Sequence, residues 1–334
     1  MDADGQPPGG SPRSGRSRRI AAGGVVAATL AVAATVAWRS GAQPDNRTTV
    51  QPPARAVSAA TPPTTAPPGP VQWVTTDERL TVGGIARRYM VVRPARMSTT
   101  PLPVVVVLHG RVAGPELEEQ RTGFPPLVGR AILVYPAGYQ QSWNAGACCA
   151  GAHDAGVDDV AFLTEVVHRV LATQHDAAPG RVFLVGFSNG GKMAFRLGCA
   201  DPSLFQGIAV VGAVPVAACD HPPVVPFAEL VFHDDPLLTL TPDQPRKPVN
   251  GFLQVSVEEE VAARRATNAC QADGVQQVQG TLTTTRWDHC RSGKPVELGV
   301  YQGSTHIWPA GNATTPSAEQ VIWTFFRSIT EDRQ

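Results

Sequence analysis

The chain has 334 residues, and its 28 lysines and arginines are balanced by 28 aspartates and glutamates. Without net charge the protein has no overall field to attract nucleic acid or an acidic polymer, so nucleic-acid binding is not expected. Hydrophobic residues make up 43% of the sequence, enough to bury a substantial core in one large domain or two ordinary ones.

The first 42 residues have the pattern of an export signal. Residues 1–19 are polar and basic, as in a cytoplasmic n-region, and they precede the apolar run Ile20–Trp38. This arrangement is typical of a signal peptide over residues 20–42, with cleavage before Gln43. The alternative is an uncleaved membrane anchor, because residues 20–38 are long enough to cross a bilayer. We therefore expect a secreted or extracytoplasmic protein that touches the membrane only through this segment, if it stays uncleaved.

The chain after this segment divides into a linker and a folded domain. Residues 43–70 consist mostly of Pro, Thr, Ala and Ser and have no periodic apolar face, which predicts a disordered linker. We expect the folded domain to span residues 71–334.

Six cysteines lie in the folded domain, and their even number fits disulfide bonds in an oxidising compartment: Cys148, Cys149, Cys199, Cys219, Cys270 and Cys290. Zinc binding is the competing interpretation, but the chain has neither a CxxC nor an HExxH spacing, so we expect no metal. Cys270 and Cys290 flank one loop-like segment, and we expect them to form a disulfide. The sequence leaves the other pairings open.

Short apolar segments recur along the folded domain and predict a parallel β-sheet. Residues 78–94, with Gly83 and Gly84 at their centre, predict a hairpin at the start of the sheet. Residues 103–110, PVVVVLHG, are rich in β-branched residues and too short for a globular helix, which predicts a central parallel strand. Similar runs predict further strands at residues 131–135, 182–185, 208–211, 228–232 and 298–301.

Apolar residues at helical spacing lie between these strands. Residues 160–171 show this spacing, and Asp158 and Asp159 before them suit the free N–H groups of a first helical turn. We expect two more helices, one after Ser188 and one over residues 318–329. Alternating strands and helices predict an α/β fold, with a mostly parallel central sheet and helices on both faces.

A serine stands where the strand at 182–185 should turn into a helix. Residues 186–190, GFSNG, fit the G-x-S-x-G nucleophile elbow, in which the serine occupies a strained turn. Side chains at the glycine positions would collide with the neighbouring strand and helix. We expect Ser188 to be a nucleophile and the backbone N–H of Asn189 to contribute to an oxyanion hole.

A nucleophilic serine needs a histidine base and an acid, which follow it in chain order on this architecture, acid first. His306, between the strand at 298–301 and the last helix, stands where the base is expected. The run FHDDP ends the strand at 228–232, and its proline begins a turn that exposes the carboxylate before it. We expect Asp235 to be the acid, with Asp234 as the fallback.

The second oxyanion donor should come from the loop after the strand PVVVVLHG. We expect this donor to be the backbone N–H of Arg111. His109, in the same loop, is expected to pack or to form hydrogen bonds in a structural role.

With these residues assembled, the chain resembles the secreted esterase family of polyhydroxybutyrate depolymerases and feruloyl or acetylxylan esterases. The matching stretches are LHG at 108–110, TGF at 122–124, YPAG at 135–138, SWNAGACC at 142–149, VDDVAFL at 157–163, GFSNGG at 186–191 and THIWPAG at 305–311. The resemblance implies that residues 71–334 form an α/β-hydrolase catalytic domain without metal or organic cofactor. It also implies action on carboxylic esters through Ser188, Asp235 and His306, with Trp143 and Trp308 lining the acyl or aromatic pocket.

Two features depart from the family pattern. The acid segment is compressed to FHDDP, and Arg111 stands in a loop that usually carries more glycine, so a guanidinium could reach the pocket. We expect an exported serine carboxylesterase acting on a small or polymeric ester, whether polyhydroxyalkanoate, feruloyl, acetyl or short-chain acyl. The alternative is a catalytically inactive α/β-hydrolase that binds a polymer or glycan at the cell surface.

Overall fold

The computed structural model describes residues 71–331. The predictions of a signal peptide or anchor and of a linker lie outside these residues. Within the described part of the chain, no helix is long and apolar enough to span a bilayer.

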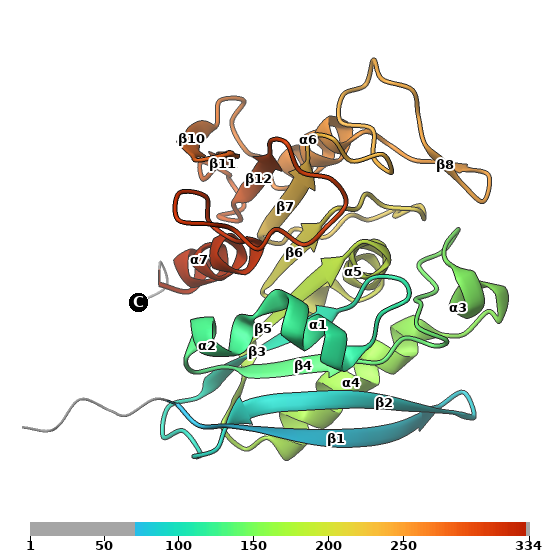
Figure 1. The fold of residues 1–334 in the computed structure, drawn as a ribbon, viewed down its shortest axis with the longest axis vertical. Coiled ribbons are helices and arrows are strands. Elements are labelled where there is room, and N and C mark those ends of the chain that lie inside the picture. Colours follow the sequence, from blue (N-terminus) through green and yellow to red (C-terminus); the bar gives the residue numbers. More distant parts are fainter. Residues whose placement is uncertain (1–70, 332–334) are drawn as a thin grey trace, which may run out of the picture. The chain divides into compact units, whose positions relative to one another are not determined.

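A ten-stranded sheet forms the centre of the described domain, in the order β1-β2-β4-β3-β5-β6-β7-β12-β11-β10 (Figure 1). Its middle six strands are mutually parallel: β4 (Ile132–Pro136), β3 (Leu102–Leu108), β5 (Ala177–Phe187), β6 (Gly207–Val211), β7 (Phe227–Phe232) and β12 (Val296–Tyr301). Antiparallel strands extend both edges: β1 (Trp73–Val82) and β2 (Ile85–Pro94) on one side, β11 (Leu282–Trp287) and β10 (Val275–Gln279) on the other.

Successive strand residues point to opposite faces of this sheet, so both faces carry apolar side chains. Helices cover both faces. One buried cluster joins alternate strand residues to the apolar stripes of α4 (Asp159–Thr173) and α5 (Asn189–Ala200). A second cluster joins the other strand residues to α2 (Phe124–Val128) and α7 (Ala318–Glu331). The predicted α/β fold with a mostly parallel sheet between two helical layers is therefore confirmed.

The predicted elements recur in the structure with ends that are shifted by a few residues. The hairpin of β1 and β2 turns at Gly83 and Gly84, which both have positive φ, a conformation that glycine adopts at little cost. The residues of PVVVVLHG that form β3 lie between β4 and β5 and are almost fully buried. Helices predicted around 160–171, after Ser188 and over 318–329 are α4, α5 and α7.

Several elements had no clear signal in the sequence. Every residue of β10 is exposed, so its sequence VQQVQ has no buried face to give an alternating pattern. The helix α6 (Val257–Thr267) has charges at five of its eleven positions, although Ser256 and Glu259 form a capping box at its start. The remaining short elements are α1 (Pro115–Thr122), α3 (Ala150–Asp154), a 3₁₀ turn (Pro202–Leu204), β8 (Pro248–Val249) and β9 (Phe252–Leu253).

All six cysteines are paired in disulfides: Cys148 with Cys149, Cys199 with Cys219, and Cys270 with Cys290. The last pair is the one expected from the sequence. The Cys199–Cys219 bond joins the end of α5 to the loop after β6, so it ties the helix that follows Ser188 to the neighbouring strand connection.

The parallel strands bring distant loops together at one edge of the sheet. The carboxyl ends of β3, β5, β7 and β12 lead into the loop of His109, into Ser188, into Asp234 and Asp235, and into the loop of His306. In open α/β sheets, ligands bind outside the carboxyl ends of the strands. This edge is therefore the expected place of a binding site.

Candidate active site

Ser188 lies in the tight turn between β5 and α5. Its φ of 54° and ψ of −117° are unusual for a residue with a side chain, and its N–H donates to the Val211 carbonyl on β6 at 2.9 Å. A Cβ on Gly186 would meet the backbone of Gly190, and a Cβ on Gly190 would meet the backbone of Leu108 and His109. The two glycines therefore let the turn close against β3 and hold the serine at the sheet edge.

Three side chains from three loops form one hydrogen-bonded chain. Ser188 Oγ lies 2.7 Å from His306 Nε2, and His306 Nδ1 lies 2.7 Å from Asp235 Oδ2. A carboxylate can only accept, so Nδ1–H donates to Asp235 and leaves Nε2 free to accept the serine proton. Phe187 stacks on the imidazole with ring centroids 5.3 Å apart. The histidine thus has the tautomer and orientation of a base for Ser188.

The two aspartates at the end of β7 have different surroundings. Asp235 is 7% exposed, and its second carboxylate oxygen accepts the Leu237 N–H at 2.8 Å. Asp234 points to solvent, where its side chain is 54% exposed and contacts His233. Of the two aspartates, Asp235 is the one whose carboxylate forms a hydrogen bond with His306.

The start of α5 supplies backbone N–H groups beside Ser188. The first N–H groups of a helix have no partner within the helix, so those after Ser188 can face a developing negative charge. The side chain of Asn189 does not compete for this place, because it exchanges two hydrogen bonds with the backbone of Trp143. Arg111, expected as the second donor, lines the same cavity as Ser188 and Asn189.

His109 is a buried structural residue beneath this edge. Its Nδ1–H donates to the Gly110 carbonyl at 2.7 Å, and its Nε2 accepts the Gly138 N–H at 2.8 Å. Burial lowers the pKa of His109 to about 4, so the ring is neutral at physiological pH. Both ring nitrogens are occupied in holding the loop after β3, as expected from the sequence.

The two tryptophans expected to line the pocket are core residues instead. Trp143 is fully buried, its Nε1–H donates to the His109 carbonyl at 2.9 Å, and its ring packs on His109. Trp308 is 6% exposed, packs edge-on against Phe187 and donates to Glu319. The prediction of a lining role is therefore wrong for both, because each indole finds its partner behind the site rather than in the cavity.

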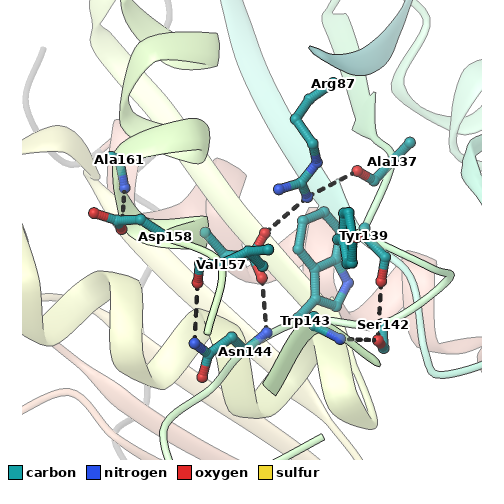
Figure 2. Close-up of polar contacts among 12 residues, drawn as sticks. Arg87, Ala137, Tyr139, Ser142, Trp143, Asn144, Val157, Asp158 and Ala161 are labelled. Carbon is teal, nitrogen blue, oxygen red and sulfur yellow. Dashed lines mark hydrogen bonds and ion pairs between the residues drawn. The ribbon is translucent and has the colours of Figure 1, made fainter. Parts of the chain in front are cut away.

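A network of polar side chains fixes the segment 142–149 next to Ser188. The buried Asp159 accepts from Arg87 of β2 at 2.7 Å and from the Asn144 N–H at 2.7 Å. Arg87 also bonds the Ala137 carbonyl, and the Asn144 side chain donates to the Val157 carbonyl (Figure 2). Burial raises the pKa of Asp159, and the Arg87 charge opposes this effect.

The sequence predicted that both aspartates of VDDV satisfy free N–H groups in the first turn of a helix. Asp158 does cap α4, because its side chain accepts the Ala161 N–H at 2.9 Å (Figure 2). Asp159 instead points into the protein toward Arg87. No local pattern distinguishes the two neighbouring carboxylates, and the signal that would have found this role is the distant Arg87, which becomes a partner only when β2 and α4 pack together.

Ser188 and His306 open into a cavity of about 470 Å³. Its wall includes the vicinal pair Cys148–Cys149 on one side and the β8–β9 hairpin on another, together with Leu237 and Leu238. This volume is in the range of small-molecule sites. Within residues 71–331, no cluster of three or more His, Cys, Asp or Glu residues is placed to hold a metal ion.

Comparisons with known proteins agree with this architecture. No protein-family model matches the chain. The protein named esterase NocK from Nocardia uniformis subsp. tsuyamanensis is 27% identical over 266 residues, covering 71% of this chain and 75% of the relative. Feruloyl esterase C of Emericella nidulans is 28% identical over 203 residues, covering 59% of this chain and 65% of the relative. The chain thus spans slightly less than two thirds of that esterase.

Among solved structures, an acetyl xylan esterase from Aspergillus awamori is similar with a TM-score of 0.51 and 13% sequence identity. The match covers 75% of this chain and 99% of that one. At this identity the likeness concerns the fold, which is that of the α/β hydrolases.

Proposed function

On the basis of its similarity to carboxylic ester hydrolases of the α/β-hydrolase fold, we propose that this protein is an exported serine carboxylesterase. The observation that carries the proposal is the hydrogen-bonded chain from Ser188 through His306 to Asp235 at the carboxyl edge of the sheet. Nucleophile, base and orienting acid follow one another at hydrogen-bond distance, which is the arrangement that serine acyl transfer requires.

The first half of the reaction forms an acyl-enzyme. Ser188 Oγ attacks the ester carbonyl while His306 Nε2 takes the hydroxyl proton. The carbonyl oxygen becomes an oxyanion, which the N–H groups of Asn189 and Arg111 stabilise. The tetrahedral intermediate then collapses, the bond to the alcohol oxygen breaks, and the imidazolium returns its proton to the leaving alcohol.

The second half releases the acid. A water molecule gives a proton to His306 and attacks the acyl-enzyme carbonyl, and the second tetrahedral intermediate breaks its bond to Ser188 Oγ, which regains the proton. Asp235 keeps Nδ1–H oriented in both halves and stabilises the imidazolium. It does not itself become protonated.

The substrate is proposed from the relatives and from the cavity. The relatives are named as feruloyl and acetyl xylan esterases, which favours a feruloyl or acetyl ester as the substrate. Acyl groups from acetyl to feruloyl suit a cavity of about 470 Å³. Three disulfides within residues 71–331 support an oxidising compartment, which agrees with export directed by residues 20–42.

The proposal is tested by hydrolysis of p-nitrophenyl acetate, butyrate and octanoate together with methyl ferulate. Ser188→Ala should lower kcat/KM by about 10⁴-fold or more. Ser203→Ala, which removes an exposed hydroxyl bonded to Asp201, is the matched control and should retain activity. Folding of each variant is checked by its circular dichroism spectrum.

A second pair of variants tests the acid. Asp235→Asn should lower kcat by about 10⁴-fold, because the amide favours the wrong histidine tautomer. Asp234→Asn should change kcat by less than about threefold, since solvent screens that exposed group. If the oxidised wild-type protein hydrolyses no ester and a fluorophosphonate does not label Ser188, the proposal fails, and the protein is an inactive binding member of the fold.

A further inference from the structure

The cavity that contains Ser188 is lined by three basic side chains and by no aspartate or glutamate. The basic residues are Arg111 from the loop after β3, Lys192 from α5 and Lys247 from the segment before β8. Among residues 71–331, no salt bridge involves any of the three. The neighbouring Arg246, by contrast, pairs with Glu259 outside the cavity wall. The cavity therefore has a positive potential that nothing in its own wall neutralises.

Lys192 is held in place by a neutral partner. It lies one helical turn after Ser188, and its backbone N–H donates to the Ser188 carbonyl at 3.0 Å. Its ammonium donates to Gln254 Oε1 at 2.6 Å, and Gln254 is only 2% exposed. The amide nitrogen of Gln254 donates in turn to the Lys247 carbonyl at 2.7 Å. Gln254 thus fixes the position of the ammonium without balancing its charge.

This charge is compensated only in part within the protein. Burial lowers the pKa of Lys192 to about 8, and the carboxylate that opposes this effect is Asp235. Asp235, however, already accepts from His306 and from the Leu237 N–H. An ammonium has three donors, and a partly buried charge without an opposite charge is costly. A ligand anion in the cavity would supply both the missing charge and an acceptor.

We propose that Lys192, with Arg111 and Lys247 beside it, forms a subsite for a carboxylate on the substrate, so that the preferred esters carry a second, ionised carboxyl group. The inference rests on the proposed esterase function and specifies its substrate class. A partly buried ammonium whose partner is a neutral amide is balanced by one negative charge, which favours a carboxylate over a dianionic phosphate. Arg111 and Lys247 attract the substrate carboxylate to the cavity. The carboxylate can belong to the acyl part or to the alcohol part of the ester.

The test compares anionic esters with neutral amides of the same shape. Monomethyl adipate and its primary amide place the difference on the acyl side, and 4-acetoxybenzoate and 4-acetoxybenzamide place it on the alcohol side. Wild-type protein should show at least about tenfold higher kcat/KM for the anion in one of the two pairs. Lys192→Gln should lower that ratio by about 10 to 100-fold, the range of a charge-assisted hydrogen bond.

Two further variants make the result specific. Lys192→Arg keeps the charge and should keep most of the ratio, which also shows that position 192 tolerates substitution. Lys294→Gln removes a lysine before β12, at the opposite edge of the sheet, and should leave the ratio unchanged. The inference is overturned if wild type cleaves the ester bond of the neutral amide analogues through Ser188 but shows no preference for either anionic ester. It is also overturned if Lys192→Gln keeps the preference.

A binding measurement separates this inference from the proposed function. Ser188→Ala cannot form the acyl-enzyme, so calorimetry can follow its binding of uncleaved 4-acetoxybenzoate and monomethyl adipate. Binding that is lost in Ser188→Ala/Lys192→Gln supports the subsite even if wild type hydrolyses no ester. Equal affinity in both proteins, or no affinity for either anion, rejects the subsite even if the esterase activity is established.

Discussion

Two regions of the sheet edge are held in place by different physical means. The elbow at residues 186–190 is held by backbone packing, because its glycines let α5 approach β3 without an intervening side chain. The surrounding loops are held by buried polar side chains: His109 bonds the loop after β3 to Gly138, and Asp159 bonds the segment 142–149 and Arg87. Backbone packing leaves a short local pattern in the sequence, whereas polar anchoring depends on partners far away in the chain.

The largest expected effect is at the elbow. In Gly190→Ala the new Cβ would lie inside the backbone of Leu108 and His109, which cannot move aside as a flexible side chain does. We expect a loss of about 3 kcal/mol or more in the free energy of unfolding, since overpacking here displaces β3 itself. Esterase kcat/KM should fall by about 100-fold or more, because the serine shifts from its position. Denaturant unfolding and ester hydrolysis measure the two effects.

The matched control is Gly180→Ala in the same strand. Gly180 is exposed, and a Cβ there would meet no atom within 4 Å. This variant should keep its activity and change the free energy of unfolding by no more than about 1 kcal/mol. Equal effects of the two substitutions would show that the elbow does not depend on the missing side chain.

The second effect concerns the anchor of segment 142–149. Asp159→Ala leaves Arg87 buried without an opposite charge and removes the acceptor of the Asn144 N–H. We expect a loss of about 3 to 5 kcal/mol in the free energy of unfolding, the usual cost of breaking a buried ion pair from one side. Thermal and denaturant unfolding measure this loss.

The neighbouring Asp158→Ala is the control for this position. It removes an exposed cap from α4 and should cost about 1 kcal/mol. A result in which Asp158→Ala costs as much as Asp159→Ala would contradict the assignment of the buried anchor to Asp159 alone.

The smallest effect is a pH dependence at Glu118. Burial raises the pKa of this fully buried carboxyl to about 7, although Arg121 lies 3.0 Å from it. The folded protein therefore holds a proton between pH 4.5 and 7 that the unfolded chain has lost, so stability falls as pH rises through this window.

Glu118→Gln should remove this slope, because the amide does not ionise. The difference in unfolding free energy between variant and wild type should shift in favour of the variant, by on the order of 1 kcal/mol, from pH 5 to pH 8. Urea unfolding at the two pH values measures it. A difference that stays constant with pH would show that Glu118 does not titrate in this window.

The elements and the elbow could be predicted because their signals are local. Buried parallel strands read as continuous apolar runs, and the glycines beside Ser188 mark a turn that tolerates no side chains. The choice between Asp235 and Asp234 could not be made in this way. Both follow the same strand, and only the direction in which each side chain leaves the turn separates the buried partner of His306 from a solvent-exposed carboxylate.

The tryptophans show how a motif can be recognised while its role is misassigned. Trp143 and Trp308 lie in stretches that resemble the family, yet their rings fill the core behind the site. An indole buries a large apolar area and needs one acceptor, and His109 and Glu319 provide acceptors away from the cavity. The sequence contains no information on which of several acceptors each N–H will reach.

The sequence by itself determined the fold class, the serine turn and the chain order of acid and base, because these follow from local periodicity, glycine spacing and the connection rules of parallel sheets. Tertiary structure alone decided which aspartate meets His306, that Arg87 pairs with Asp159, and that Lys192 faces the cavity against the neutral Gln254. These contacts join residues 71 positions apart for the aspartate and histidine, 72 for the arginine and aspartate, and 62 for the lysine and glutamine. Their partners are selected by packing in three dimensions, which no short pattern records.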